Sequence, residues 1–389
     1  MLVKLKDIAD VIISNVDKKI KENEKKVYLC NFTDVYNNYA ITKKGNINFM
    51  MASASKSQID KFSIKKGYLA ITKDSETRDD IGVGTFFADN FDNLLLGYHC
   101  ALIKPNTSLV NSKFLNAYIQ SPFARKYYEL NASGSGQRYT LTIDTIANTP
   151  IYLPAYDVQL KIGNLLSEID KQIERNNAVV KRLQVLAQTI FNKFYKNKML
   201  NFNGTLNNLC SLPSGYNFKP DSYTLNGKYD LITIKNVNGI FVDYQKTNKI
   251  NELPDNLKSY CKLNIGDILI SLTGNVGRIS INTASNGLLN QRVSIILCKN
   301  NDYKLYIYLL LNNPYYQLKI TQMANGTSQK NLSPLDIKKL KIYIPYNITE
   351  FNNVTKGILN QMCKINLQTN KLIAIKNKIL PLLINGQLK

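Results

Sequence analysis

Acidic residues are scarce in this chain relative to basic ones. Lysine and arginine number 50 against 28 aspartates and glutamates, which gives a formal net charge of +22 at pH 7. A chain rich in Lys, Asn and Ile can reflect an AT-rich genome, but such a bias would not remove acidic residues. The excess of positive charge therefore favours a polyanionic partner, most often nucleic acid, and makes a membrane surface the weaker alternative.

Metal-binding and disulfide patterns are also missing from the sequence. The chain has one histidine, His99, and six cysteines, no two of which are spaced as in a CxxC pair. A metal site is therefore not expected, and His99 is interpreted as a core or surface residue. Scattered single cysteines are typical of reduced thiols in a cytosol, so we expect a cytoplasmic protein.

Long apolar runs and the commonest catalytic motifs are absent too. No stretch approaches 18 apolar residues, and the first residues lack the apolar core and cleavage site of a signal peptide, so we expect neither a membrane span nor secretion. No GxxxxGK[ST] phosphate loop occurs. The segment NPYY (313–316) departs from the NPPY of adenine methyltransferases and follows a helical run instead of a strand. Nucleotide hydrolysis and methyl transfer are therefore not expected of this chain alone.

What the sequence does contain is an internal repeat. The segment SGSGQRYTLTIDTIANTPIYLP (133–154) returns as NGTSQKNLSPLDIKKLKIYIP (325–345), with the closing Ile-Tyr-Leu-Pro shifted by one residue. The matched pairs, each 192 positions apart (326 − 134), are Gly134 and Gly326, Gln137 and Gln329, Arg138 and Lys330, and Asp144 and Asp336.

Each repeated segment leads through a proline into a long heptad pattern. Apolar residues at alternating steps of four and three run from Ile162 to Ile190 and again from Val354 to Leu382. Such patterns predict two long helices that pair as an antiparallel coiled coil, which would bring two central amides together and fix the register. The alternative is two separate amphipathic helices. The seam residues nearest the centre are Ile169, Ile173, Asn176, Val180, Ile365, Gln368 and Leu372.

The stretches between these helices favour a mixed structure in which strands dominate. In the second half, strands are expected in 228–244 (with a turn at Asn238-Gly239), 265–281 and 290–299, echoed in the first half by 27–38, 65–72 and 95–106. A short helix is expected before each repeated segment, in 113–130 and 303–320. The predicted fold is α+β with a pseudo-twofold repeat, divided into strand-rich domains at 1–155 and 198–347 and helices at 156–197 and 348–389.

The duplicated layout, the segment GDILISLTGNVG (266–277) and the two segments before the prolines resemble the specificity subunit of type I restriction-modification systems. The resemblance covers nearly the whole chain, although Tyr68 stands where the second half has Asp267. It implies that each strand-rich part is a target-recognition domain reading half of a bipartite double-stranded DNA site. It also implies that the helices space these domains and dock two methyltransferase subunits.

The resemblance further implies that this chain has no catalytic activity of its own. S-adenosylmethionine would be bound by the partner subunits, and so would ATP and Mg where the system has restriction subunits. The alternatives are a stand-alone nucleic-acid-modifying enzyme with unrecognised motifs and a coiled-coil interaction scaffold.

Candidate DNA contacts are the polar and basic residues of the glycine-bearing turns. Arg, Gln and Asn suit base edges, while Lys, Arg and Ser suit phosphates. Loops repeated in both halves are expected to position DNA, because two different half-sites call for dissimilar readers; the alternative is that these loops only shape the entry to the helix. The candidates are Ser135, Gln137, Arg138, Lys73 and Arg78 in the first half, and Thr273, Asn275, Arg278, Gln291, Arg292, Ser328, Gln329 and Lys330 in the second.

Overall fold

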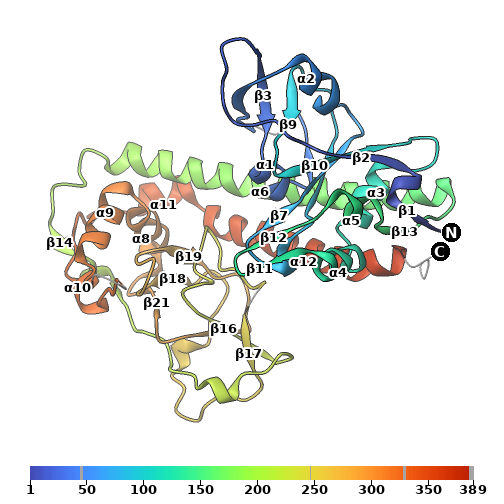
Figure 1. The fold of residues 1–389 in the computed structure, drawn as a ribbon. Helices are drawn as coiled ribbons and strands as arrows, with labels where there is room; N and C mark the ends of the chain where they lie inside the picture. The colour runs from blue at the N-terminus through green and yellow to red at the C-terminus, as the bar shows by residue number, and fades with distance from the viewer. Residues whose placement is uncertain (44–46, 246, 327–329, 385–389) are drawn as a thin grey trace. The chain divides into compact units, whose positions relative to one another are not determined.

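The computed structural model describes residues 1–43, 47–245, 247–326 and 330–384. The chain divides into two compact units, a first unit of Met1–Ile173 with Leu372–Lys389 and a second unit of Glu174–Lys371. Two long helices, α6 (Tyr156–Tyr195, green) and α12 (Ile358–Ile384, red), each contribute to both units (Figure 1). No helix in the described ranges is both long and apolar enough to cross a membrane.

The first unit contains a five-stranded sheet and a three-stranded sheet. The larger has the order β2 (Ala9–Ile13), β10 (Cys100–Pro105), β6 (Leu69–Thr72), β8 (Gly84–Phe87) and β4 (Ala40–Ile41). The smaller has the order β5 (Met50–Ala54), β3 (Lys25–Cys30) and β9 (Leu94–Leu96), with β3 antiparallel to β5 and parallel to β9. Strands were therefore correctly predicted within 27–38, 65–72 and 95–106.

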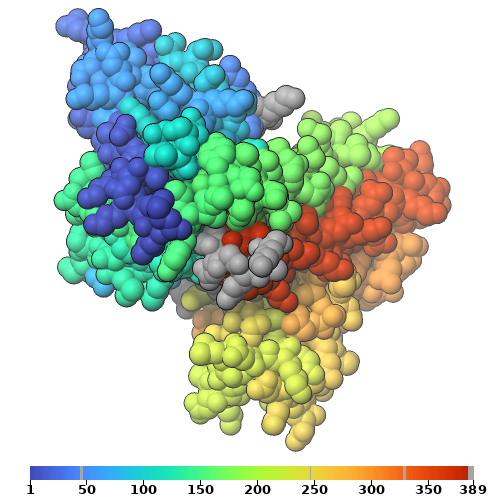
Figure 2. Space-filling model, turned by 90° about the vertical axis from the view of Figure 1, so that its right-hand side faces the viewer, coloured from blue at the N-terminus to red at the C-terminus, as the bar shows by residue number. Residues whose placement is uncertain are grey.

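Further elements of the first unit connect these sheets to α6. The chain's first strand, β1 (Leu2–Lys4), pairs with β13 (Pro150–Tyr152) just before α6, and in the space-filling view the dark blue first residues lie against the green part of the chain (Figure 2). A third small sheet has the order β11 (Ser133–Ser135), β12 (Arg138–Thr140) and β7 (Asp74–Ser75). The remaining helices are α1 (Phe32–Asn37), α2 (Lys56–Phe62), α3 (Ser112–Ile119), α4 (Pro122–Asn131) and α5 (Ile143–Ala147).

The second unit repeats this topology in shorter strands. One three-stranded sheet has the order β17 (Asn248–Ile250), β16 (Tyr229–Ile232) and β20 (Gly287–Leu289), and another has the order β19 (Ile279–Ile281), β18 (Ile268–Ser271) and β21 (Val293–Ile295). Two further sheets have two strands each: β15 (Cys210–Ser211) with β22 (Leu297–Cys298), and β14 (Gly204–Thr205) with β23 (Lys341–Ile342). As in the first unit, the central strand β16 is antiparallel to one neighbour and parallel to the other. Its helices are α7 (Leu206–Leu209), α8 (Lys304–Leu311), α9 (Pro314–Met323), α10 (Pro334–Lys338) and α11 (Thr349–Thr355).

Each helix predicted ahead of a repeated segment is in fact two helices. A proline at the first helical position ends the preceding helix and begins the next, because it cannot donate a backbone hydrogen bond and fixes φ. Ser121 caps α4 by accepting from the backbone of Ala124, and Asn313 caps α9 by accepting from that of Tyr315. NPYY (313–316) is therefore a helix start.

The predicted hairpin turn at Asn238-Gly239 is wrong. Strand β16 pairs with β17, not with the residues that follow Gly239. Those residues join another sheet: Val242 N donates to Ile281 O at 3.0 Å, and Ile281 N donates to Ile240 O at 2.8 Å. The strands predicted in 265–281 and 290–299 are confirmed as β18, β19, β21 and β22.

In the structure, the one-residue shift between the two repeats occurs earlier in the chain than the sequence match indicated. Thr142 caps α5 as Ser333 caps α10, and buried Ile146 corresponds to buried Ile337, all 191 positions apart (337 − 146). The slip therefore lies inside the repeated loops, where the second copy is one residue shorter. The predicted equivalences of Asp144 with Asp336 and of Arg138 with Lys330 are wrong as a consequence. Asn331 occupies the place of Thr140, so Lys330 corresponds to Tyr139.

The two long helices run antiparallel, as predicted. In the first unit the start of α6 shares a buried cluster with the end of α12, through Ile162, Leu166 and Leu380. In the second unit the end of α6 shares one with the start of α12, through Phe191 and Ile358. The central residues of the α6 series are buried (Asn176, Val180) or half-buried (Ile169, Ile173).

The predicted heptad series of the C-terminal helical region differs from the observed burial. At alternate positions the predicted residue is exposed, and the residue that follows it is buried or half-buried. Ile365 and Leu372 are half-buried, but Gln368 is exposed and cannot form half of a buried amide pair, so its predicted place in the seam is wrong. Gly357, at φ +81°, separates α11 from α12, whereas α6 is continuous, so the second helix restarts in a different phase. The exposed predicted positions are Val354, Gln361, Gln368, Ile375 and Leu382, and the buried or half-buried residues that follow them are Thr355, Met362, Thr369, Lys376 and Leu383.

Candidate nucleic-acid interface

In the first unit, three segments meet beside the end of strand β6. The backbone N–H of Lys73 donates to His99 O at 3.0 Å, and the N–H of Leu141 donates to Lys73 O at 2.7 Å. The first bond ties the strand end to the turn between β9 and β10. The second ties it to the repeated loop, whose hairpin β11–β12 also pairs with β7.

Asp74 is the side chain that holds these three segments together. Its carboxylate accepts from Thr140 Oγ1 at 2.7 Å, lies 2.7 Å from His99 Nδ1, and forms an ion pair with Lys73 Nζ at 2.9 Å. Burial acts to raise the pKa of Asp74, but the hydrogen bonds from His99, Thr140 and Lys73 outweigh it, so the pKa is lowered. The carboxylate is therefore ionised at neutral pH.

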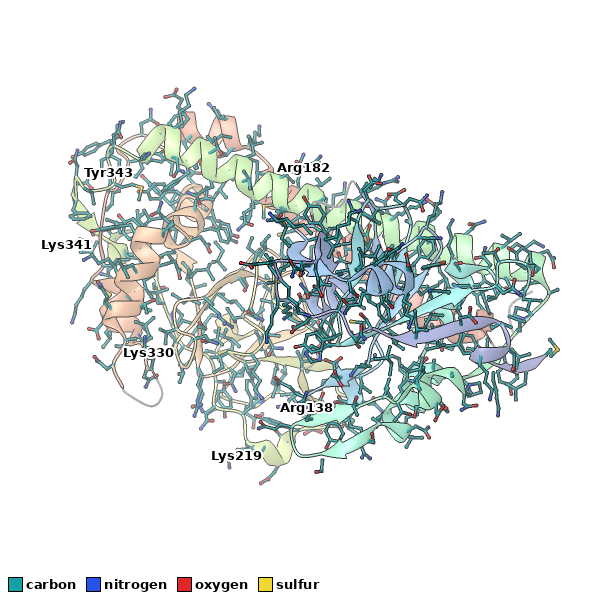
Figure 3. The ribbon with its side chains drawn as sticks, turned by 45° about the horizontal axis from the view of Figure 1, so that its top comes forward. Arg138, Arg182, Lys219, Lys330, Lys341 and Tyr343 are labelled. Carbon is teal, nitrogen blue, oxygen red and sulfur yellow. The ribbon has the colours of Figure 1, made fainter. Side chains whose placement is uncertain are left out.

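The repeated hairpin of the first unit presents polar side chains to solvent. Ser135, Gln137 and Arg138 are all exposed. Arg138 is labelled in Figure 3. Gly134 adopts φ +118°, and a Cβ there would lie 2.2 Å from Arg138 O, so only glycine permits this hairpin. The guanidinium carbon of Arg78 lies 5.2 Å from the centre of the Tyr139 ring, which holds Arg78 beside the same hairpin.

The second unit builds the same frame with different side chains. Leu272 N donates to Arg292 O at 3.0 Å, and Leu332 N donates to Leu272 O at 2.7 Å. In place of the Asp74–Thr140 bond, Thr273 Oγ1 donates to Asn331 Oδ1 at 3.1 Å. The segments border a surface hollow of about 570 Å³, lined by Leu272, Thr273, Gln291, Arg292, Asn325, Asn331, Leu332, Ser333 and Pro334.

The candidates of the second unit divide by exposure. Gln291, Arg292 and Asn275 are exposed, and Arg278 is half-buried. Lys330 is exposed (Figure 3), and its carbonyl accepts from Gly274 N at 2.9 Å, which places Lys330 against the 272–278 turn. Ser328 and Gln329 lie outside the described residues.

Two of the candidate residues, Thr273 and Lys73, have polar groups that are already engaged in contacts within the protein. Thr273 is buried, with its hydroxyl bonded to Asn331, and so supports the loop from within. Lys73 is mostly buried and its ammonium is paired with Asp74. A cation held in this way is a weaker phosphate ligand than the exposed Arg138, because moving it toward DNA would break the Asp74 contact.

Sequence reasoning missed two groups of residues near this interface. Tyr98 and His99 occupy the place in the first unit that Gln291 and Arg292 occupy in the second. The signal was present in the sequence, because Gly97 and Asn290 stand 193 positions apart (290 − 97), close to the offset of the repeated loops.

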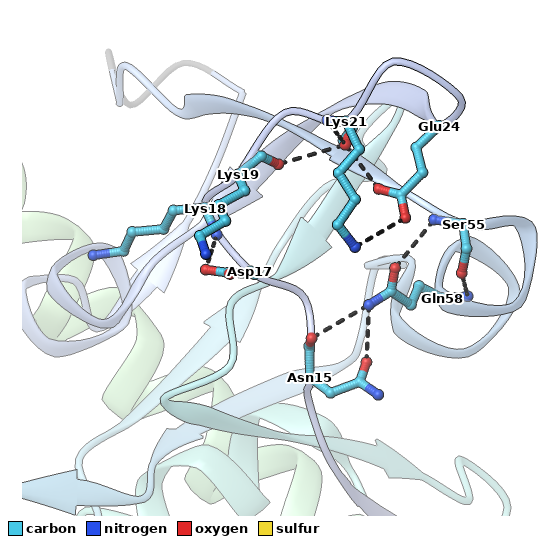
Figure 4. A network of polar contacts seen from close by, with 9 residues as sticks. Asn15, Asp17, Lys18, Lys19, Lys21, Glu24, Ser55 and Gln58 are labelled. Atoms are coloured by element: carbon cyan, nitrogen blue, oxygen red, sulfur yellow. Dashed lines mark hydrogen bonds and ion pairs between the residues drawn. The ribbon is translucent and has the colours of Figure 1, made fainter.

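The second missed group is a lysine-rich loop ahead of β3. Ser53 Oγ accepts from Lys21 N at 2.8 Å and donates to Glu24 Oε2 at 2.7 Å, and the backbone N–H of Ser53 donates to Lys19 O at 3.2 Å (Figure 4). These contacts fix the loop while leaving several lysines exposed. The exposed lysines are Lys18, Lys19 and Lys21 on the loop, together with Lys25 and Lys26 at the start of β3.

Comparisons with known proteins agree with the duplicated architecture. Residues 1–184 and 202–377 match a family model described as the type I restriction modification DNA specificity domain. The chain is 21% identical over 442 residues to the type I restriction enzyme HindI specificity subunit of Haemophilus influenzae, an alignment that covers 93% of this chain and 94% of the relative.

A solved structure shares the fold. The S subunit of a type I restriction-modification system from M. genitalium matches with a TM-score of 0.58 at 14% identity, and the match covers 98% of this chain and 95% of that one. Similarity along both whole chains means that the globular parts and the long helices occur in the same order in both proteins.

Proposed function

Since this chain belongs to the family of type I restriction-modification DNA specificity domains, we propose that it is the sequence-specific DNA-binding subunit of such a system. The observation that carries the proposal is the frame built twice, once in each unit, from matching backbone hydrogen bonds but dissimilar exposed side chains. A protein that reads a bipartite site needs this combination, a common support and two different reading surfaces.

The two frames suit DNA in chemistry as well as in layout. The net charge of +22 favours association with phosphates, and exposed Arg138 and Lys330 lie on the repeated loops, where both units would meet the backbone in the same way. Exposed Gln291 and Arg292 have the donors and acceptors that base edges require. Positioning and reading therefore fall to different residues of one surface.

Catalysis belongs to partner subunits in this proposal. Two methyltransferase subunits would dock on the chain and bind S-adenosylmethionine, and restriction subunits, where the system has them, would bind ATP and Mg. The chain would supply the target and carry out no reaction itself. It would act on double-stranded DNA in the cytoplasm.

Two assays on the purified full chain test this assignment. We expect no methylation and no cleavage of DNA by the chain alone, and sequence-specific adenine methylation when the methyltransferase subunits and S-adenosylmethionine are added. Binding should also weaken steeply as salt rises. Methylation by the chain without partners would mean that it is an enzyme, and salt-insensitive, weak binding would favour a scaffold.

A further inference from the structure

Given the DNA-recognition role proposed above, we infer that two equivalent dipeptides read bases, Tyr98-His99 in the first unit and Gln291-Arg292 in the second. Both lie in the turn that joins the parallel partner of the central strand to the next strand. The dipeptides share no residue type, and the backbone connections establish that they occupy one position.

The backbone equivalence extends over the whole turn. Cys100 N donates to Gly97 O and Val293 N donates to Asn290 O. The turns also make matching parallel bridges to the start of each globular part, Gly97 with Val16 and Asn290 with Tyr216. With the bonds from the strand ends to His99 O and Arg292 O, this makes Tyr98 equivalent to Gln291 and His99 equivalent to Arg292.

In these turns the backbone makes the hydrogen bonds that hold the frame together, which leaves the exposed side chains available to contact DNA. The carbonyls of His99 and Arg292 accept the frame's hydrogen bonds, whereas Tyr98, Gln291 and Arg292 expose their side chains. If the dipeptides served only to shape the turn, similar residues would suffice in both units. At this position the two frames present dissimilar and largely exposed polar side chains, so different half-sites can be told apart here.

In the second unit the dipeptide has the groups that recognise purines. Arginine can donate two hydrogen bonds to the O6 and N7 atoms of guanine, and glutamine can bond in the same paired way to adenine. Gln291 and Arg292 border the hollow of about 570 Å³ beside the repeated loop. Asn325 and Asn331 line the same hollow, so a base edge entering it would meet further polar residues.

In the first unit the histidine is oriented by the frame. An ionised carboxylate only accepts hydrogen bonds, so the contact with Asp74 places a hydrogen on His99 Nδ1 and leaves Nε2 as an acceptor while the ring is neutral. Among the described residues Nε2 has no hydrogen-bond partner. The Tyr98 ring lies against His99, with 3.9 Å between ring centres. This dipeptide therefore presents an acceptor and an aromatic edge, a different pattern from Gln-Arg.

Lys18 provides a matched control for the first unit. It lines a small hollow together with Tyr98 and His99 and is exposed, but it lies on the lysine-rich loop. A lysine suits a phosphate more than a base edge. Replacing it should weaken binding to all sequences alike and leave the recognised motif unchanged.

The test is a modified-base map of a methylation-free bacterial genome that expresses the full chain with its methyltransferase subunits. Two variants are compared with wild type: Gln291→Ala/Arg292→Ala, and Tyr98→Gln/His99→Arg, which keeps a hydrogen-bond donor beside Asp74. We expect each variant to change one or two adjacent positions of one block, a different block for each variant. The preference for the original base should fall by roughly tenfold or more. Lys18→Ala should keep both blocks.

Thermal unfolding of each variant separates misreading from misfolding, and binding of the purified variants to oligonucleotides replaces the map if methylation is lost. An unchanged motif in both variants, or one variant altering both blocks, overturns the inference. A wild-type chain that directs no two-block motif would instead refute the DNA-recognition role itself, so the two failures are distinguishable.

Discussion

Asp74 is the residue on which the geometry of the first reading surface depends most directly. It joins His99, Thr140 and Lys73, which come from three separate segments, and its carboxylate is mostly buried. Nothing in the local sequence marks it, because its partners are 25 and 66 residues away in the chain for His99 and Thr140. The predicted function of neighbouring Lys73 was plausible from charge alone, but the pairing with Asp74 could be seen only in three dimensions.

The lowered pKa of Asp74 gives a pH-dependent stability. Because the folded state holds this proton less tightly than the unfolded chain does, the contribution of Asp74 is present above its ordinary pKa of 3.8 and is lost as the pH falls through the lowered folded value. Asp74→Asn should therefore reduce the free energy of unfolding by about 1–3 kcal/mol near pH 7. The difference between wild type and variant should shrink below about pH 4, as urea unfolding at several pH values would show. A difference independent of pH would contradict the assignment.

Arg138 and Lys330 are exposed cations, one on each of the two repeated loops, which favours phosphate contacts. Replacing either by alanine should lower DNA affinity for all sequences about equally and reduce the slope of log K against log salt by about 1. Fluorescence anisotropy with a cognate and an unrelated duplex at several salt concentrations measures both effects. Arg182→Ala, an exposed residue on α6, is the matched control and should leave the slope unchanged. Loss confined to the cognate duplex would instead make these residues base readers.

At the scale of elements, an ion pair joins the two long helices within the first unit. Asp170 on α6 lies 2.7 Å from Lys376 on α12, and the two side chains are only 8% and 14% exposed. The ammonium also lies 4.1 Å from the centre of the Tyr39 ring. Burial raises the pKa of Asp170, and the attraction of Lys376 only partly offsets this effect. The pair is thus a specific contact whose desolvation is costly.

Single and double replacements at this pair should behave oppositely. Asp170→Asn leaves a buried cation without its counter-ion and should destabilise the protein by about 3–5 kcal/mol. Asp170→Leu with Lys376→Met removes both charges and should be neutral or stabilising. Differential scanning calorimetry of the full chain compares the three proteins. If the double variant is as unstable as the single one, the charges themselves hold the helices together.

Heptad patterns predicted the helices but not the full seam of the second one. The existence of α6 and α12, the length of α6 and the antiparallel pairing follow from spacing, and Asn176 is buried as predicted. The phase of α12 does not follow from this spacing. Gly357 interrupts the helical region, whereas the predicted heptad pattern continues through this glycine without a break. A polar residue such as Thr369, which bonds its own helix at Ile365 O, carries no apolar signal even though it is buried.

At the scale of the whole molecule, the repeat could be recognised from the sequence where the two halves have similar residues, but not where their residues differ. The loops before each proline match in sequence, so both loops could be proposed in advance as candidate DNA contacts, although the slip places Lys330 at the position of Tyr139 and not of Arg138. The turns that hold Tyr98-His99 and Gln291-Arg292 share only backbone hydrogen bonds, which leave no mark on residue type. The same reason limits prediction of the strands, since residues 240–242 joined a neighbouring sheet instead of closing a hairpin.

The central claim is that one chain carries two different DNA-reading surfaces on one repeated frame. Its most direct test is the modified-base map of a methylation-free bacterial genome that expresses the methyltransferase subunits with and without this chain. We predict a motif of two short blocks separated by a gap, methylated at adenine only when this chain is present. Methylation that does not require the chain, or a single ungapped motif, would contradict the account.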